Sequence, residues 1–299
     1  MWWQLTAGAL AVVIAAAGLY AGIVWMHLPR SAAVAPPPAP SPALTSLALP
    51  IRAAFYYPWF PEAWHQQGMD PFTHYRPTLG YYGTTVTTVR QQVRAMQYAG
   101  IRAGIASWWG QSSATDSRTA MLLQIGALTG FRWALYYELE GQGDPSVSTL
   151  ASDLAYIGAR YASQPGYLRV LGRPVLFVYA DGKDSCGMAV LKVFTGYRTC
   201  VNQPDAWHQY APAQAEDSQA GFSFAISPGF WKATESAPRL ARDPSRWATS
   251  ISDMVASRAP WQLVTTFNEW GEGTAVEDAT QWQSATAFGI YLDALHRTI

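Results

Sequence analysis

Residues 261–274 read WQLVTTFNEWGEGT, and this stretch indicates both the class of fold and the position of the chemistry. The apolar run at its start predicts a buried β-strand, which leads into two glutamates three residues apart, Glu269 and Glu272. A carboxylate close to a core is costly unless it is paired or used, and catalytic groups stand at the carboxyl ends of strands in barrels and open α/β sheets. One interpretation is a carboxylate pair for acid/base chemistry on a sugar. The other is a structural network, in which Glu269 accepts backbone amides and Glu272 is solvated.

Strand-like and helix-like stretches alternate from residue 51 to the end of the chain. Strands are predicted at residues 51–57, 101–108, 131–138, 174–179, 221–226 and 261–267, with a weaker pair at 188–194 and 197–201 and a short eighth piece within 274–278. Helices are predicted at residues 84–99, 116–128, 148–161, 244–258 and 284–297. Such alternation implies parallel strands joined by right-handed crossovers.

A (β/α)8 TIM-like barrel over residues 51–299 fits this pattern best, and an open doubly wound sheet is the alternative. No glycine-rich dinucleotide or phosphate loop follows the first strand, which weakens the alternative and gives no reason to expect a cofactor. The HExxH, P-loop and GxSxG motifs are also absent from the sequence, so metalloprotease, NTPase and α/β-hydrolase functions have no support.

Several predicted strands end in aromatic or acidic side chains, and in a barrel these ends converge on one face. They provide the candidate substrate-binding residues Tyr56, Tyr57, Trp59, Trp108, Trp109, Glu138, Tyr179, Asn268 and Trp270. A cleft with aromatic walls and carboxylate, amide and phenol groups suits a neutral polyhydroxylated ligand. The expected partner is therefore an oligo- or polysaccharide.

The composition agrees with such a ligand. The 14 Trp and 16 Tyr residues are numerous enough to provide stacking platforms for sugar rings, although a large core would also use many of them. The 20 basic and 20 acidic residues balance, and no basic stripe is visible in the sequence, so nucleic acid is not an expected partner.

Residues 1–30 are predicted to be a membrane anchor. No charged side chain precedes Arg30, and the apolar run over residues 2–26 is long enough to cross a bilayer. A cleavable signal peptide has a shorter apolar core that follows early positive charge. The sequence therefore predicts an uncleaved transmembrane helix, and with it a membrane-anchored protein.

Residues 31–50 are rich in Pro and Ala and predict an extended linker between the anchor and the domain at residues 51–299. The two cysteines, Cys186 and Cys200, have a spacing and context that make a poor metal site, and no metal is expected. They form a disulfide if the domain is extracytoplasmic, and two unrelated buried thiols are the alternative. A domain on a spacer is typically displayed outside the cytoplasm, which favours the disulfide.

Six blocks of the sequence resemble glycoside hydrolase family 99, the endo-α-mannosidase and bacterial endo-α-mannanase group. The resemblance spans about residues 51–280, and its blocks lie at residues 55–59, 76–82, 96–101, 137–138, 227–230 and 267–274. The last block is the most specific, because its Asn-Glu-Trp-x-Glu-Gly-Thr pattern closely matches the catalytic loop of the family.

The resemblance implies a barrel that cleaves internal α-mannosidic bonds with retention. The position of Glu269 is that of the carboxylate that assists the sugar 2-hydroxyl in attacking its own anomeric carbon. The position of Glu272 is that of the group that protonates the leaving oxygen and then activates water. Glu138 and Tyr57 match residues that line the active site of the family, whereas Gly271 stands where the family usually has His.

The alternative function is a non-catalytic carbohydrate-binding barrel at the cell surface. Such a protein would keep the aromatic side chains but would not need both Glu269 and Glu272. The presence of both favours the enzyme.

Overall fold

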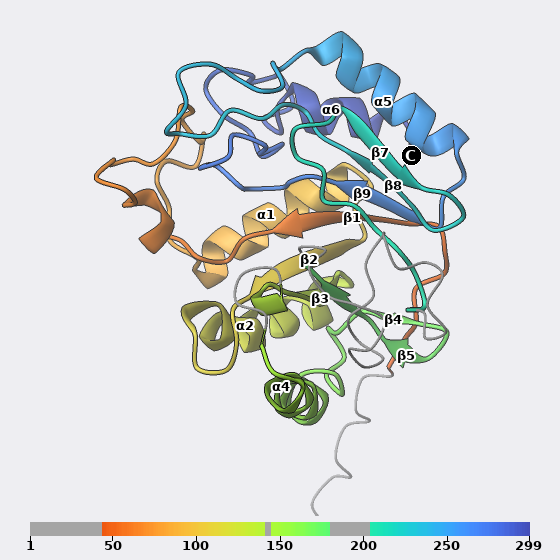
Figure 1. Ribbon diagram of the computed structural model, residues 1–299. Helices are drawn as coiled ribbons and strands as arrows, with labels where there is room; N and C mark the ends of the chain where they lie inside the picture. The colour runs from red at the N-terminus through yellow and green to blue at the C-terminus, as the bar shows by residue number, and fades with distance from the viewer. Residues whose placement is uncertain (1–43, 141–144, 180–203) are drawn as a thin grey trace, which may run out of the picture. The chain divides into compact units, whose positions relative to one another are not determined.

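A curled sheet of seven strands forms the centre of an α/β fold in the computed structural model, which describes residues 44–140, 145–179 and 204–299 (Figure 1). Residues 42–299 make up one compact unit. The strand order is β6-β3-β2-β1-β9-β8-β7, and all neighbours are parallel except β7 and β8. The strands are β1 (Ile51–Tyr56), β2 (Ala103–Trp108), β3 (Arg132–Tyr137), β6 (Leu176–Val178), β7 (Glu216–Gln219), β8 (Ser223–Ile226) and β9 (Trp261–Val264).

An aromatic contact across its concave face shows how strongly the sheet curls. Phe177 on β6 lies 5.1 Å from Trp261 on β9, measured between ring centroids. The strand order places four strand spacings between β6 and β9, which is about 19 Å in a flat sheet. Only a sheet bent into part of a barrel brings these two rings together.

The class of the predicted (β/α)8 barrel is thus confirmed as a TIM-like α/β fold, of which the described residues form part of a barrel. Over the described residues the sheet is a half-barrel, in which β6 and β7 are edge strands. The antiparallel strand β7 and the small hairpin of β4 (Arg169–Val170) and β5 (Arg173–Pro174) are not among the predicted elements. Residues 274–278 form no eighth strand, and the weaker predicted pair at 188–194 and 197–201 lies outside the described residues.

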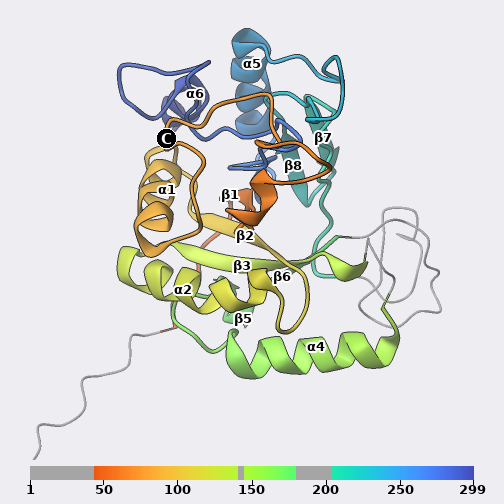
Figure 2. The same ribbon diagram turned by 90° about the vertical axis from the view of Figure 1, so that its left-hand side faces the viewer.

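Helices cover the convex face of the sheet, as the predicted crossovers require. Figure 2 shows α1 (Val86–Tyr98) beside α2 (Ala114–Thr129), with α5 (Pro244–Ala256) and α6 (Ile290–His296) above them and α4 (Val147–Arg160) below. Hydroxyl and carboxylate side chains cap the starts of α1, α2, α4 and α5: for example, Ser113 accepts from the amide of Asp116, and Asp243 accepts from the amides of Ser245 and Arg246. A left-handed glycine, Gly130, ends α2.

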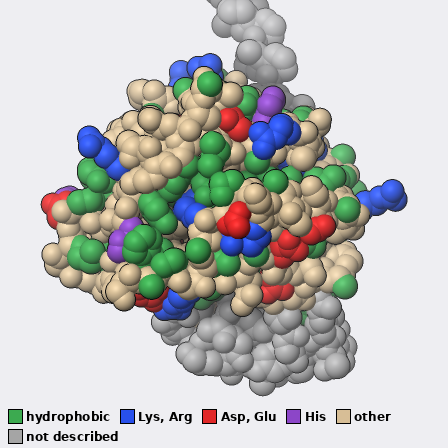
Figure 3. All heavy atoms as spheres, turned by 90° about the horizontal axis from the view of Figure 1, so that it is seen from above, with side chains coloured by type: hydrophobic (Ala, Val, Ile, Leu, Met, Phe, Trp, Pro, Cys, Tyr) green, Lys and Arg blue, Asp and Glu red, His purple; other side chains and the backbone are tan. Residues whose placement is uncertain are grey.

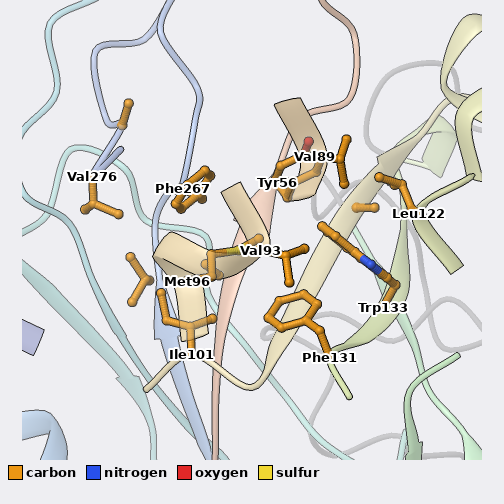
Figure 4. Packing of buried hydrophobic residues seen from close by; sticks show 14 of the residues in the cluster. Tyr56, Val89, Val93, Met96, Ile101, Leu122, Phe131, Trp133, Phe267 and Val276 are labelled. Carbon is orange, nitrogen blue, oxygen red and sulfur yellow. The ribbon is translucent and has the colours of Figure 1, made fainter. Parts of the chain in front are cut away.

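Alternating side chains divide the strand residues between two hydrophobic clusters, because neighbours along a strand point to opposite faces. Phe55 on β1 and Tyr57 just after it belong to the cluster on the concave face, whereas Tyr56 at the end of β1 belongs to the cluster under the helices. Figure 4 shows the second cluster, where Val93 and Met96 of α1 pack near Tyr56. The concave cluster is open to one end of the half-barrel, and the candidate site lies there.

Among the described residues, no helix is both long enough and apolar enough to cross a membrane. The anchor predicted within residues 1–30 lies outside the described residues, as does most of the predicted linker at 31–50. Cys186 and Cys200, and with them the predicted disulfide, also lie outside the described residues.

Candidate active site

A cleft of about 320 Å³ opens at the carboxyl ends of β1, β3 and β9, on the concave side of the sheet. Three carboxylates, four phenols and one ammonium group contribute to its lining. The lining residues are Tyr57, Trp59, Gln66, Gln67, Phe72, Tyr136, Glu138, Tyr179, Tyr210, Lys232, Glu269, Gly271 and Glu272. Its position is that of a barrel active site.

Glu269 is held in the cleft by its own loop. Its Oε1 accepts a hydrogen bond from the amide of Gly271 at 3.2 Å, and its Oε2 accepts one from the amide of Glu272 at 3.1 Å. Its backbone amide donates to Oγ1 of Thr266 at 2.8 Å. The side chain is buried, so these bonds fix the carboxylate with little freedom to turn away.

Glu272 lies on the same loop and is held from the opposite wall. The hydroxyl of Tyr210 donates to Oε2 of Glu272 at 3.0 Å. The backbone of residues 231–233 runs alongside the loop, since Trp231 donates to the carbonyl of Glu272 and Ala233 donates to that of Gly271. Lys232 stands between these two anchored residues and lines the cleft.

The environment keeps a proton on the carboxylate pair at neutral pH. Burial, and then the charge of Glu272, raise the pKa of Glu269 to about 8. Burial also raises the pKa of Glu272, against the hydrogen bond from Tyr210 and the positive charges of Lys232 and Arg239. A pair with one proton between two carboxyl groups provides both an acid and a base.

Glu138 is the third carboxyl group of the cleft. Burial raises its pKa to about 8, against a hydrogen bond from the Ser107 hydroxyl, so it is largely protonated at neutral pH. Its Oε1 is buried and has no hydrogen-bond partner among the described residues, and the same holds for Nε1 of Trp59. A buried polar atom without a partner is costly, and a sugar hydroxyl in the cleft would supply one.

Six of the residues predicted from the sequence come together in this cleft: Tyr57, Trp59, Glu138, Tyr179, Glu269 and Glu272. Their roles in binding and catalysis stay predictions. The geometry shows that strand ends distant in sequence converge as expected.

The other five predicted substrate-binding residues do not line the cleft. Tyr56, Trp108 and Trp270 are buried on the helix side, where they bond to Gln92, Asp116 and Tyr82 respectively. Asn268 is fully buried and bonds to both backbone groups of Tyr57, so it donates to neither catalytic candidate. Trp109 is partly exposed and donates to Ser107. Strand alternation explains why Tyr56 and Trp108 lie on the helix side, because the residues next to them in the sequence point to the concave face.

The remaining lining residues were not predicted as site residues. Tyr136 was foreseeable, because it lies on β3 two positions before Glu138, and side chains two positions apart along an extended chain point to the same side. Lys232 lies two residues after the family-like block at residues 227–230, and this proximity is the only sequence signal for its place in the site. Tyr210 and the pair Gln66 and Gln67 come from irregular segments that carry no periodic signal.

Phe72 occupies the space beside Gly271. A Cβ atom at Gly271 would lie 2.8 Å from Cδ1 of Phe72 and 3.2 Å from Oε1 of Glu269. The loop between the two glutamates therefore has no room for a side chain there, and an aromatic ring forms this part of the wall instead.

Charge elsewhere on the molecule is mixed in sign. On the face seen in Figure 3, acidic and basic side chains are interspersed among apolar ones. Over the described residues, no group of three or more His, Cys, Asp or Glu side chains is arranged to hold a metal ion.

Comparison with known proteins finds the same architecture in a glycosidase. Two solved structures of the GH99 endo-α-mannosidase from Bacteroides thetaiotaomicron are similar to this chain. The complex with BIS-TRIS-propane gives a TM-score of 0.63 at 19% identity, and the other gives 0.66 at 18%. In both, the match covers 84% of this chain and 96% of that chain. No family model and no curated protein matches the sequence. The predicted resemblance to GH99 is thus confirmed as a likeness of fold.

Proposed function

We propose that this chain is a glycoside hydrolase that cleaves internal α-mannosidic, or related α-glycosidic, bonds in a glycan. The observation that carries the proposal is the fixed pair of Glu269 and Glu272, which shares a proton at the open end of a GH99-like half-barrel. The aromatic and phenolic lining suits the apolar faces and hydroxyl groups of a sugar.

The chemistry follows the roles that the resemblance assigns. In the reactive form the proton that the pair shares lies on Glu272, so Glu269 is ionised and takes the proton of the sugar 2-hydroxyl, whose oxygen then attacks the anomeric carbon. Glu272 gives its proton to the glycosidic oxygen as the bond to the leaving group breaks, and a 1,2-anhydro sugar results. Glu272 next takes a proton from water, which opens this ring at the anomeric carbon, while Glu269 returns its proton to O2. Two inversions at one carbon give overall retention.

Three side chains of this chain support those steps. Tyr210 donates to Glu272 and would orient it toward the leaving oxygen. Lys232 lowers the pKa of both glutamates through its charge. Glu138, with its unpartnered oxygen, would hold a sugar hydroxyl as a neutral donor.

The number of lining residues favours a chain of sugars over a single one. Tyr57 and Trp59 pack together with ring centroids 4.5 Å apart and form one wall, and Gln66 and Gln67 also contribute to the lining. An enzyme with several subsites releases oligosaccharides and prefers long substrates.

The deciding experiment is hydrolysis of defined α-mannans and α-glucans, with oligosaccharide products resolved by size. Glu269→Gln and Glu272→Gln should each lower kcat by roughly 10²–10⁴-fold and leave the fold intact. The matched control is Glu216→Gln, a β7 carboxylate outside the cleft lining. Near wild-type turnover in either cleft variant would contradict the role of that carboxylate. Glycan binding without any turnover would favour the non-catalytic binding barrel, and exclusive release of single sugars would rule out endo action.

We also propose that the domain is displayed outside the cytoplasm on the anchor predicted within residues 1–30. The support is the sequence alone: the apolar segment, the Pro/Ala-rich linker and the isolated cysteine pair. A bond between Cys186 and Cys200 would stabilise the fold by about 3 kcal/mol in the chain-entropy description. Thiol titration of protein from an oxidising compartment tests the bond, and two free thiols would contradict it.

A further inference from the structure

Glu277 is a buried carboxylate that the proposed chemistry does not use. Its side chain is 4% exposed and lies outside the cleft lining. Three donors converge on it: the Tyr82 hydroxyl reaches Oε2 at 2.6 Å, the Trp270 indole reaches Oε2 at 3.3 Å, and Nε2 of Gln92 reaches Oε1 at 2.9 Å. Gln92 in turn accepts from the hydroxyl of Tyr56 at 2.6 Å. We call these five side chains the Glu277 network.

The backbone fixes Glu277 against the end of β9. Its amide donates to the carbonyl of Phe267 at 2.9 Å, and the amide of Val276 donates to that of Thr266 at 3.0 Å. The intervening loop closes on itself, since the amide of Thr274 donates to the carbonyl of Glu269. The backbone of Glu277 is therefore held in place, and its side chain extends from there to Trp270 on the loop.

Trp270 connects this fixed point to the candidate catalytic pair. It stands between Glu269 and Glu272 in the sequence and is fully buried, whereas both glutamates line the cleft. Its indole bonds to Glu277 and to Tyr82 at 3.1 Å, and it stacks on Trp282 with centroids 6.0 Å apart. A shift of Trp270 would thus move both carboxylates.

We propose that Glu277 is a positioning residue, which acts through Trp270 to fix the loop that places Glu269 and Glu272 in the cleft. The activity part of this inference rests on the proposed function. Its structural part does not, because it concerns the anchoring of Trp270.

The donors explain why a carboxylate stands at this position. With three donors to satisfy, Glu277 needs two oxygens that both accept. Glutamine there has only one accepting oxygen, and when that oxygen accepts from Gln92, its amide group faces Trp270 and leaves the indole without this acceptor. Exchanging the two residues restores the pattern. The carboxylate then at position 92 would accept from Tyr56 and from the side-chain amide at position 277, and the oxygen of that amide would still accept from Tyr82 and Trp270.

The experiment compares Glu277→Gln with the exchange variant Gln92→Glu/Glu277→Gln in the full chain. The first readout is hydrogen exchange of the Trp270 indole N–H in protein labelled with ¹⁵N-tryptophan, and the second is kcat and KM on the best glycan. Glu277→Gln should speed indole exchange at least tenfold and lower kcat by about 10–100-fold with little change in KM, because a displacement of about 1 Å costs up to 10²-fold. The variant with the two residues exchanged should restore both the protection of the Trp270 indole N–H and the wild-type kcat.

Asp116→Asn is the matched control. Asp116 is another buried carboxylate, which accepts from the indole of Trp108 at 2.8 Å and from the hydroxyl of Tyr161 at 2.7 Å, away from the loop. Asp116→Asn should speed hydrogen exchange of the Trp108 indole N–H and leave that of the Trp270 indole, and kcat, unchanged.

Wild-type protection of Trp270 in Glu277→Gln, or a fall in kcat no greater than in Asp116→Asn, would overturn the proposal. If Glu277→Gln does not fold, Trp270→Phe removes the indole donor together with part of the buried ring, and an unchanged kcat there would overturn the proposal as well. If the wild-type chain hydrolyses no glycan, the proposed function fails, and indole exchange still decides whether Glu277 anchors the loop.

Discussion

Replacing Tyr210 by Phe removes one hydroxyl from the cleft and tests how Glu272 is tuned. The lost bond is the 3.0 Å hydrogen bond to Oε2 of Glu272. A hydrogen bond to a charged group contributes about 1.5–3 kcal/mol, and each pKa unit corresponds to about 1.36 kcal/mol. Glu272 is only partly buried, so water replaces some of the loss, and we expect a rise of about one unit in its pKa. The sign is upward because Tyr210 stabilises the ionised form.

The assay is the pH dependence of kcat/KM, which reports the groups of the free enzyme. If Glu272 must be protonated to serve the leaving oxygen, the alkaline limb of the profile moves to higher pH by about one unit. Tyr136→Phe is the control, since it removes a phenol from the same cleft without removing a bond to Glu272, and its profile should keep the wild-type limbs. An unshifted alkaline limb in Tyr210→Phe, or a shift to lower pH, would refute this account.

Three further outcomes are expected. Gly271→Ala should destabilise the fold by about 1–3 kcal/mol and impair turnover, because its Cβ would lie 2.8 Å from Phe72; thermal melting and kcat measure the two effects, and a Tm indistinguishable from that of the wild type would contradict the crowding. Glu138 should make stability fall as pH rises from about 4.5 toward 8, since its raised pKa of about 8 lets the native state hold a proton that the unfolded chain has lost. Glu138→Gln should therefore reduce the dependence of Tm on pH in this range. An unchanged dependence would count against the raised pKa of Glu138. Trp59→Ala should weaken the binding of long glycans more than that of short ones. Trp108→Ala should instead cost about 3–5 kcal/mol of stability and leave the preference for glycan length unchanged. A changed length preference in Trp108→Ala but not in Trp59→Ala would place Trp108, and not Trp59, in the cleft.

The sequence predicts the parts of this fold that depend on short-range patterns. Apolar runs locate β1 and β9, and the acidic ending of the last strand locates Glu269 and Glu272 in the cleft. Curvature is a property of strand pairing and long-range packing, so the sequence does not distinguish a half-barrel from a closed one. The contact of Phe177 with Trp261 is an example, because only the curvature of the folded sheet brings these two rings together.

Side-chain direction is the second source of error, although the sequence does carry information on it. Once Tyr57 is assigned to the concave face, period-two alternation places Tyr56 under the helices, as the structure shows. The same rule turns Trp108 away from the cleft. Tyr210 is different, because it comes from an irregular segment whose path only the tertiary contacts determine.

The cleft and the concave core share two rings, Tyr57 and Tyr136. Phe55, Tyr136 and Phe177 pack together on the concave face, and Tyr136 also lines the cleft. Recognition and folding are thus under joint selection at these positions, and a substitution that reshapes the floor also opens a void beneath it. New specificities can arise with less conflict on the walls, at the Gln66–Gln67 turn and around Lys232. Diversification of this scaffold should therefore proceed from its rim inward.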